Sequence, residues 1–296
     1  MKIQGAFTAL VTPWTEDDAL DVEAWAKIIK WQIDGGIDGL VVAGTTGESP
    51  NISDAEKQRA TEIAIELSAG RVPVVVGTGT NSTASSVTAT KLAKQWGADA
   101  ALVVCPYYNK PTQEGMFRHF EAVYEEAGLP IVAYNVPGRT ASDLRPETIA
   151  RLVEVGAIVA VKDATADMTR AAETLAAVDP SKPFSLMSGD DFTILPFVAS
   201  GGAGVVSVVS NLVPGDTSRL VAESAAGNWE VARPLNAKII ELSRALFEVS
   251  NPIPVKAAAA QLGLCRSQPR LPLVDADETV NESVRRAMLR YGGILG

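Results

Sequence analysis

Lys162 is the residue in this sequence that is best placed for covalent chemistry, because it ends an apolar run. Residues 157–161 read AIVAV, which is typical of a buried parallel strand. Desolvation disfavours an ammonium ion, so burial would free the amine as a nucleophile for carbonyl carbon atoms. The alternative is a strand-end lysine whose stem lies on apolar surface and whose charge reaches solvent. The other polar residues at the ends of apolar runs favour the interpretation of Lys162 as a nucleophile.

Four other residues at or shortly after the ends of apolar runs could bind an anion or transfer protons. Thr45 and Thr46 lie between two glycines, where hydroxyls and backbone N–H groups can form a cradle for an anion. Tyr134 ends another apolar run and is placed to relay protons. Arg139 follows a Pro-Gly pair and can hold a carboxylate through two parallel hydrogen bonds. Taken singly, these residues also fit a plain turn, a core aromatic residue and a surface arginine.

Several further polar residues have simpler interpretations. Tyr107 and Tyr108 are adjacent in an expected loop, where such pairs more often serve packing or interfaces. The pair at 190–191 resembles a metal-binding pair, but Asp191 is better explained as a first-turn residue of the next helix. His119 lies in a helical pattern between arginine and phenylalanine, which favours a surface or packing role over that of a base.

The elements that must position these residues alternate along the chain. Amphipathic helical segments separate the apolar runs, and Ser53 with Glu56 forms a capping-box pattern at the start of one of them. Eight such units predict an α/β protein with a (β/α)8 TIM barrel. An open doubly wound sheet is the alternative, but the expected glycine-rich turn after the first strand is missing. The predicted strands are 6–11, 40–43, 72–76, 100–104, 131–134, 158–162, 184–187 and 204–208. The predicted helices are 21–33, 53–67, 82–96, 113–127, 145–153, 168–178, 191–199 and 214–226.

The strand pattern stops near residue 226. Residues 228–249, 252–262 and 277–291 carry apolar side chains at helical spacing. We therefore expect a catalytic barrel over residues 1–226 and a C-terminal helical domain over residues 227–296.

Composition excludes several classes of function. The formal net charge is −9 and the isoelectric point is about 4.8, without a basic stripe, so nucleic acid is a poor partner. Only Cys105 and Cys265 occur, which predicts no disulfide framework and a cytoplasmic location. We expect Cys105, at the end of an apolar run, to be a buried and inert thiol. No signal peptide or membrane-spanning run is expected, and a single histidine argues against a His-rich metal site.

The motifs taken together resemble the dihydrodipicolinate synthase family, within the wider pyruvate-dependent Schiff-base aldolases. The resemblance extends over essentially the whole chain. The lysine-centred pattern alone would indicate only the wider superfamily, whereas the PGRT and NPIPVK segments are more specific. The motifs are GTTGE at 44–48, YYNKP at 107–111, YNVPGRT at 134–140, VKDAT at 161–165 and NPIPVK at 251–256.

The resemblance implies an activity and a set of roles. Such an enzyme condenses pyruvate with L-aspartate 4-semialdehyde at the entry to diaminopimelate and lysine biosynthesis, without metal or organic cofactor, usually as a homotetramer of tight dimers. The implied roles are a Schiff base with pyruvate on Lys162, and a proton relay of Tyr134, Thr45 and a Tyr108 from the neighbouring subunit. Thr45 and Thr46 would hold the pyruvate carboxylate and Arg139 that of the semialdehyde, while Gly189 and Val206 would line the site.

Departures from the family pattern concern loop geometry and regulation. The family commonly has glycine where this chain has Ala141, which puts the fine geometry of the Arg139 loop in question. Lysine-sensitive members bind lysine at the dimer interface, typically with histidine at the position of Lys57 and glutamate at that of Ser85. Lys57 adds a like charge and Ser85 carries none, so we expect weak feedback inhibition by lysine.

Two other functions compete with the synthase. A related class I aldolase or dehydratase would act on a 2-keto-3-deoxy sugar acid, but a neutral polyol has less use for Arg139. A barrel that only senses a keto acid would not need Lys162 together with Tyr134, Tyr108 and Thr45.

Overall fold

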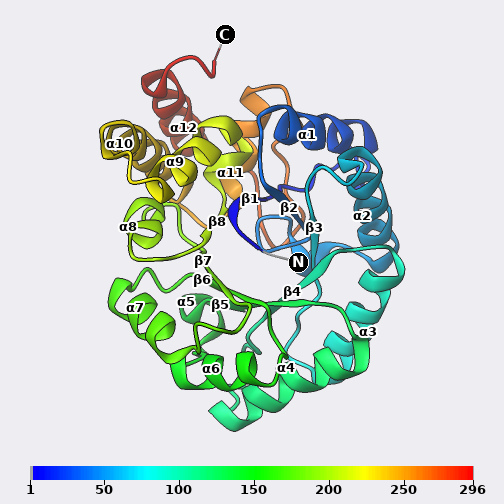
Figure 1. Cartoon of the computed structure of the whole chain (residues 1–296). Coiled ribbons are helices and arrows are strands. Elements are labelled where there is room, and N and C mark those ends of the chain that lie inside the picture. The colour runs from blue at the N-terminus through cyan, green and yellow to red at the C-terminus, as the bar shows by residue number, and fades with distance from the viewer. Residues whose placement is uncertain (1–2, 296) are drawn as a thin grey trace.

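A closed barrel of eight parallel strands occupies the centre of the molecule (Figure 1). The structure is a computed structural model that describes residues 3–295. The strands pair in chain order and β8 closes on β1, which confirms the predicted (β/α)8 barrel. The strands are β1 (Gly5–Ala9), β2 (Gly39–Val42), β3 (Val74–Gly77), β4 (Ala100–Val104), β5 (Ile131–Asn135), β6 (Ala160–Asp163), β7 (Ser185–Ser188) and β8 (Gly204–Ser207).

Helices surround the barrel and follow the predicted order. Their ends differ from the predicted ends by at most three residues, and the capping box of Ser53 and Glu56 is present. One short helix, α5, was not predicted and carries Arg139. The helices around the barrel are α1 (Val22–Asp34), α2 (Asp54–Ser68), α3 (Thr83–Gln95), α4 (Gln113–Ala127), α5 (Pro137–Thr140), α6 (Pro146–Glu154), α7 (Met168–Ala177), α8 (Ile194–Ala199) and α9 (Pro214–Ala225), with 3-10 turns η1 (Ser49–Asn51) and η2 (Val209–Asn211).

The alternation of side chains along each strand separates two apolar clusters. Val132 and Tyr134 of β5 belong to the cluster inside the barrel, whereas Ala133 between them packs outward against the helices. The neighbouring strand β6 pairs Lys162 with Tyr134 in register. The pleat therefore places Lys162 and Tyr134 as neighbours on the inner face of the barrel wall.

Three further helices follow the barrel: α10 (Trp229–Leu246), α11 (Ile253–Gln261) and α12 (Glu278–Tyr291). Figure 1 shows α10 and α12 beside α9, and α10 packs against α8, α9 and α12. The division into residues 1–226 and 227–296 stays a prediction. None of the helices within residues 3–295 has the length and apolarity needed to cross a membrane.

The prediction for Asp191 was wrong in its detail. Helix α8 begins only at Ile194, and the Asp191 carboxylate instead accepts hydrogen bonds from the N–H groups of Val208 and Val209, each at 2.9 Å. The barrel brings the end of β7 next to the end of β8, so this carboxylate serves the turn after the neighbouring strand. Residues 3–295 contain no group of three or more His, Cys, Asp or Glu side chains placed to hold a metal ion.

His119 and Cys105 are both buried, as their packing roles require. The Nδ1 atom of His119 lies 3.0 Å from the Thr83 hydroxyl, and burial lowers the pKa of His119 to about 4. Burial likewise raises the pKa of the Cys105 thiol, which keeps it protonated and unreactive. Neither residue takes part in the chemistry considered below.

Candidate functional site

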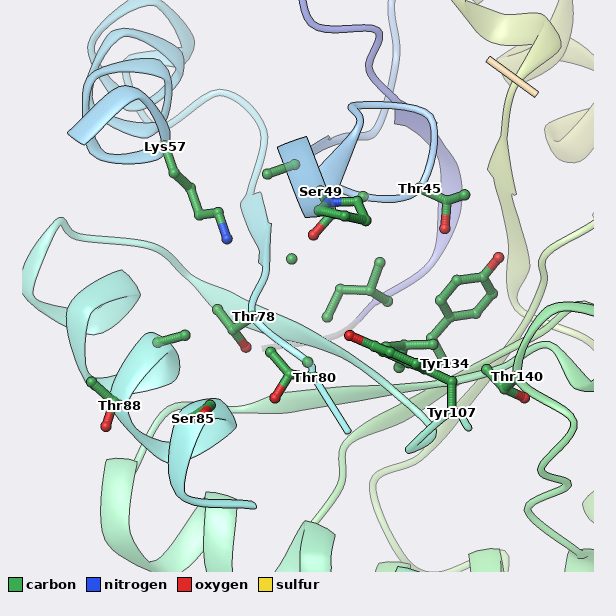
Figure 2. Close-up of a pocket in the computed structure, with 18 of the residues that line it drawn as sticks. Thr45, Ser49, Lys57, Thr78, Thr80, Ser85, Thr88, Tyr107, Tyr134 and Thr140 are labelled. Atoms are coloured by element: carbon green, nitrogen blue, oxygen red, sulfur yellow. The ribbon is translucent and has the colours of Figure 1, made fainter. Parts of the chain in front are cut away.

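A cavity of about 680 Å³ opens at the C-terminal end of the barrel strands. Its walls are formed by the loops after β2, β3, β4 and β5 together with helices α2 and α3. The loops that follow the strands are where (β/α)8 enzymes carry their active sites. Figure 2 shows Tyr107 pointing into the middle of this space, so the cavity has two parts. We name the part lined by Gly44, Thr45, Tyr134, Val136, Arg139 and Thr140 the barrel lobe. The part lined by Ser49, Asp54, Lys57, Thr78, Thr80, Ser85 and Thr88 is the outer lobe.

Lys162 lies below the barrel lobe, against Tyr134. Its Nζ atom is 4.2 Å from the centroid of the Tyr134 ring, and only 5% of Lys162 is exposed. Gly189 on the neighbouring loop leaves space for this side chain, because an added Cβ would lie 3.0 Å from Lys162 Cε. Val206 of β8 is buried in the same inner cluster as Tyr134. Tyr134 lines the cavity, whereas Lys162 behind its ring is not among the lining residues.

The two threonines after β2 differ in position. Thr45 lines the barrel lobe, and Figure 2 shows it beside the hydroxyl end of Tyr134. Thr46 is buried behind it and accepts a hydrogen bond of 3.0 Å from Asn251 Nδ2. The N–H groups of Gly47 and Glu48 bond inside the turn, to the carbonyls of Gly44 and Thr45. An anion cradle here therefore depends on the N–H and hydroxyl groups of the two threonines.

Arg139 reaches the barrel lobe from the short helix α5. Its Nη2 atom lies 3.4 Å from the carbonyl oxygen of Asn251, to which it donates. Helix α5 ends at Ala141, which adopts the left-handed conformation with φ of 53°. This is the conformation that glycine adopts without steric cost, so the alanine keeps the loop but strains it.

The structure does not bring Tyr108 together with the other predicted site residues of the same chain. Tyr108 is 87% exposed and has a positive φ of 73°, a strained backbone conformation for a tyrosine. Its N–H group donates to the Thr140 carbonyl at 3.4 Å, which ties the loop to α5. Tyr107, for which only a packing or interface role was predicted, lines the cavity instead.

Comparison with known proteins identifies the family to which this site belongs. The model of the dihydrodipicolinate synthetase family matches residues 2–290. The chain belongs to the dihydrodipicolinate synthetase family. The 4-hydroxy-tetrahydrodipicolinate synthase of Anaeromyxobacter dehalogenans is 45% identical over 291 residues, 98% of each chain. As the names of its relatives indicate, this member of the dihydrodipicolinate synthetase family is an enzyme.

Solved structures of the dihydrodipicolinate synthetase family share the whole fold with this chain. Dihydrodipicolinate synthase from Thermotoga maritima superposes with a TM-score of 0.96 at 40% identity, over 99% of both chains. The enzyme from Acinetobacter baumannii, solved as a complex with pyruvate, has a TM-score of 0.96 at 41% identity and covers 99% of this chain and 100% of its own.

In this member of the dihydrodipicolinate synthetase family, Asn251 contacts two predicted site residues, although no role was predicted for it. It joins the loop after β2 to α5, because its side chain donates a hydrogen bond to Thr46 while its carbonyl oxygen accepts one from Arg139. The Oδ1 atom of Asn251 is buried without a hydrogen-bond partner in residues 3–295. Asn251 heads the NPIPVK motif, but its partners are distant in sequence and no local pattern reveals them.

A buried charge network supports the loop that carries Thr45 and Thr46. Glu48 and Lys256 form an ion pair of 2.7 Å with both side chains fully buried. Trp14 Nε1 donates to the same carboxylate at 2.9 Å, and the Arg270 N–H group donates to its other oxygen at 2.7 Å. Because the charges are paired and hydrogen-bonded, removing one partner alone would leave a costly buried ion. The sequence carries one sign of this ion pair. Glu48 is the single charged residue of the GTTGE motif, and Lys256 is the single charged residue of the NPIPVK motif.

Proposed function

We propose that this enzyme is a 4-hydroxy-tetrahydrodipicolinate synthase that condenses pyruvate with L-aspartate 4-semialdehyde in the diaminopimelate and lysine pathway. The observation that carries the proposal is the buried amine of Lys162, held 4.2 Å from the Tyr134 ring below a cavity with separate anion-binding groups. Further support comes from the related Acinetobacter baumannii enzyme, whose structure was solved with pyruvate.

The first half of the reaction joins pyruvate to Lys162. The neutral amine adds to the ketone carbon, and loss of water leaves a protonated imine between Lys162 Nζ and C2 of pyruvate. The pyruvate carboxylate lies at Thr45 and Thr46. The imine draws electrons from the adjacent methyl group, which loses a proton and becomes an enamine carbon nucleophile. The chemistry needs no metal, because the imine itself is the electron sink.

The second half forms the carbon–carbon bond. The enamine carbon attacks the aldehyde of the semialdehyde, and the amino group of this substrate then displaces Lys162 and closes the ring. One water leaves overall for each pair of substrates. Protons move through the hydroxyls of Tyr134 and Thr45, with Tyr108 supplied by the neighbouring subunit. The 87% exposure of Tyr108 supports a role outside its own chain, and we expect a cytoplasmic homotetramer built from tight dimers.

Arg139 accounts for the choice of the second substrate. It lines the same lobe as Thr45 and Tyr134, and its guanidinium can pair with the carboxylate of the semialdehyde. An aldolase or dehydratase for a 2-keto-3-deoxy sugar acid would place a neutral polyol there and leave the guanidinium without its anion. The charge of the barrel lobe therefore favours the semialdehyde.

The test is product formation with each candidate substrate. Purified enzyme is given pyruvate with L-aspartate 4-semialdehyde, and separately a 2-keto-3-deoxy sugar acid, and products are identified by mass spectrometry. We expect a cyclic product from one pyruvate and one semialdehyde, and no cleavage of the sugar acid. Faster cleavage of the sugar acid than condensation would instead assign the aldolase function.

A further inference from the structure

The last residues of β5 and β6 carry polar side chains on the outer face of the barrel wall. The register that pairs Tyr134 with Lys162 also pairs Asn135 with Asp163. Because side chains alternate along a strand, Asn135 and Asp163 face the surrounding helices. Asn135 is 0% exposed and Asp163 is 3% exposed, so both need hydrogen-bond partners inside the protein. The groups that hold these two side chains also hold the strand ends that present Tyr134 and Lys162.

Arg170, in the first turn of α7, joins the end of β6 to a loop. Its Nε atom donates to Asp163 Oδ2 at 3.2 Å, and its Nη1 atom donates to Asp143 Oδ2 at 3.0 Å. Its Nη2 atom donates to the carbonyl oxygen of Leu144. Only 12% of the Arg170 side chain is exposed. The rigid, planar guanidinium can hold these three acceptors together, because its five N–H groups point in fixed directions.

The loop that Arg170 holds is the one that follows Arg139. Helix α5 carries Arg139 and runs directly into this loop. Asn135 binds the same loop from β5, because its Nδ2 atom donates to Asp143 Oδ1 at 3.0 Å and its Oδ1 atom accepts from the Leu144 N–H group at 3.0 Å. The network therefore fixes the end of α5 against the ends of both strands.

We infer that Arg170 is a positioning residue that sets the distance between the Arg139 guanidinium and Lys162. This role rests on the proposed function, in which Arg139 binds the carboxylate of the semialdehyde and Lys162 carries the enamine. Lys162 is also held by the strand pairing of β6 with β5 and β7, so it depends less on Arg170 than α5 does. A displacement of about 1 Å between reacting groups can cost about a hundredfold in rate.

The test is a double-mutant cycle between Arg170 and Arg139, measured separately for the two halves of the reaction. Arg170→Met keeps an unbranched side chain and removes the guanidinium. We expect kcat/KM for the semialdehyde to fall about tenfold, and by no more than in Arg139→Ala, because the loss arises from a misplaced Arg139. The rate of pyruvate adduct formation, trapped with borohydride, should stay within about twofold of that of the unmodified enzyme.

The double variant shows whether Arg170 acts through Arg139. Adding Arg170→Met to Arg139→Ala should then cost little further activity, since coupled residues are not additive. Losses that multiply in the double variant would overturn this role, and so would an equal loss in both halves of the reaction for Arg170→Met alone. Arg118→Met, an arginine of α4 whose side chain is 75% exposed, is the matched control and should change neither half.

Asp143→Asn keeps the question open to test if Arg170→Met fails to fold. It replaces one acceptor oxygen by an NH2 group, which cannot accept a hydrogen bond from Arg170. We expect the same kind of loss as in Arg170→Met, confined to the semialdehyde step and smaller in size. An equal loss in both halves of the reaction would overturn the role of this network.

Hydrogen exchange of backbone amides separates the role of Arg170 from the proposed function. Arg170→Met should speed exchange in residues 137–144 about tenfold and leave residues 160–163 unchanged. If the unmodified enzyme does not condense the two substrates, the proposed function fails, whereas faster exchange in 137–144 would still support the hold of Arg170 on the loop. Unchanged exchange in 137–144, with normal condensation by the unmodified enzyme, would overturn that hold.

Discussion

At the residue scale, the chemistry of Lys162 depends on what surrounds its side chain. The amine lies over the Tyr134 ring, and the lack of a side chain at Gly189 leaves space for the carbon chain of Lys162. The buried position keeps the amine away from bulk water, while the adjacent phenol offers a proton donor and acceptor. These two neighbours support the proposal that Lys162 acts as the nucleophile.

Arg139→Ala tests whether the guanidinium serves the second substrate. We expect kcat/KM for the semialdehyde to fall about tenfold or more, since a charge-assisted contact is worth about 1.5–3 kcal/mol. Formation of the pyruvate adduct should change much less. Arg145→Ala, an exposed arginine at the start of α6, is the matched control. Equal losses in both steps would mean that Arg139 mainly holds the loop through Asn251.

Ala141→Gly tests the strain at the end of α5. Alanine has a φ of 53° here, so glycine should stabilise the folded protein by about 1 kcal/mol in urea unfolding. Ala222→Gly in the regular helix α9 should destabilise it by about 0.5–1 kcal/mol, because glycine loses more backbone entropy. If both variants lose stability alike, the left-handed alanine is not strained.

At the element scale, the loop after β2 depends on the segment before α11. Asn251 donates to Thr46 across 205 positions of sequence, and Lys256 pairs with Glu48 across 208. These contacts fix the turn that presents Thr45 to the cavity. The C-terminal helices therefore contribute to the geometry of the site although they contribute no side chain to its lining.

Thr46→Val measures the contact with Asn251. The substitution keeps the shape but leaves the buried Asn251 amide without its acceptor, so we expect a loss of about 1–3 kcal/mol in unfolding free energy. Thr46→Ser keeps the hydroxyl and loses one methyl group, at a cost of about 1 kcal/mol or less. Urea unfolding without substrates compares the two. A smaller loss for Thr46→Val than for Thr46→Ser would contradict the structural role of this hydrogen bond.

Sequence patterns predicted the elements better than their long-range partners. The eight strands follow from short apolar runs that end in polar residues, because burial on both faces leaves such a mark. Helix α5 escaped prediction, since four residues give no periodicity. The contacts of Asn251 and Asp191 also escaped, because they join loops that only the closed barrel brings together.

At the scale of the whole molecule, one buried network links the barrel to the C-terminal region. Trp14 after β1, Glu48 after β2 and Lys256 of α11 meet at a single carboxylate. Arg270 lies over the Trp14 indole ring, with its guanidinium carbon 3.6 Å from the centroid, and also pairs with Glu56 of α2. The network makes a separately folding barrel unfavourable, because cutting the chain would expose unpaired charges.

Mixed oligomers test whether Tyr108 acts across a subunit interface. Tyr108→Phe and Lys162→Ala subunits should each be nearly inactive alone. Mixing them should restore part of the activity, because a mixed dimer would contain one site with Lys162 and a tyrosine from the partner. Differently tagged subunits show whether exchange has occurred. Demonstrated exchange without recovered activity would contradict a shared site.

The most direct measurement of the central claim is borohydride reduction of the enzyme in the presence of pyruvate, followed by mass mapping of peptides. We predict one pyruvate adduct per chain, located on Lys162, absent from Lys162→Ala and unchanged in Lys30→Ala. An adduct that persists in Lys162→Ala, or one that maps to another lysine, would contradict the assignment of Lys162 as the nucleophile.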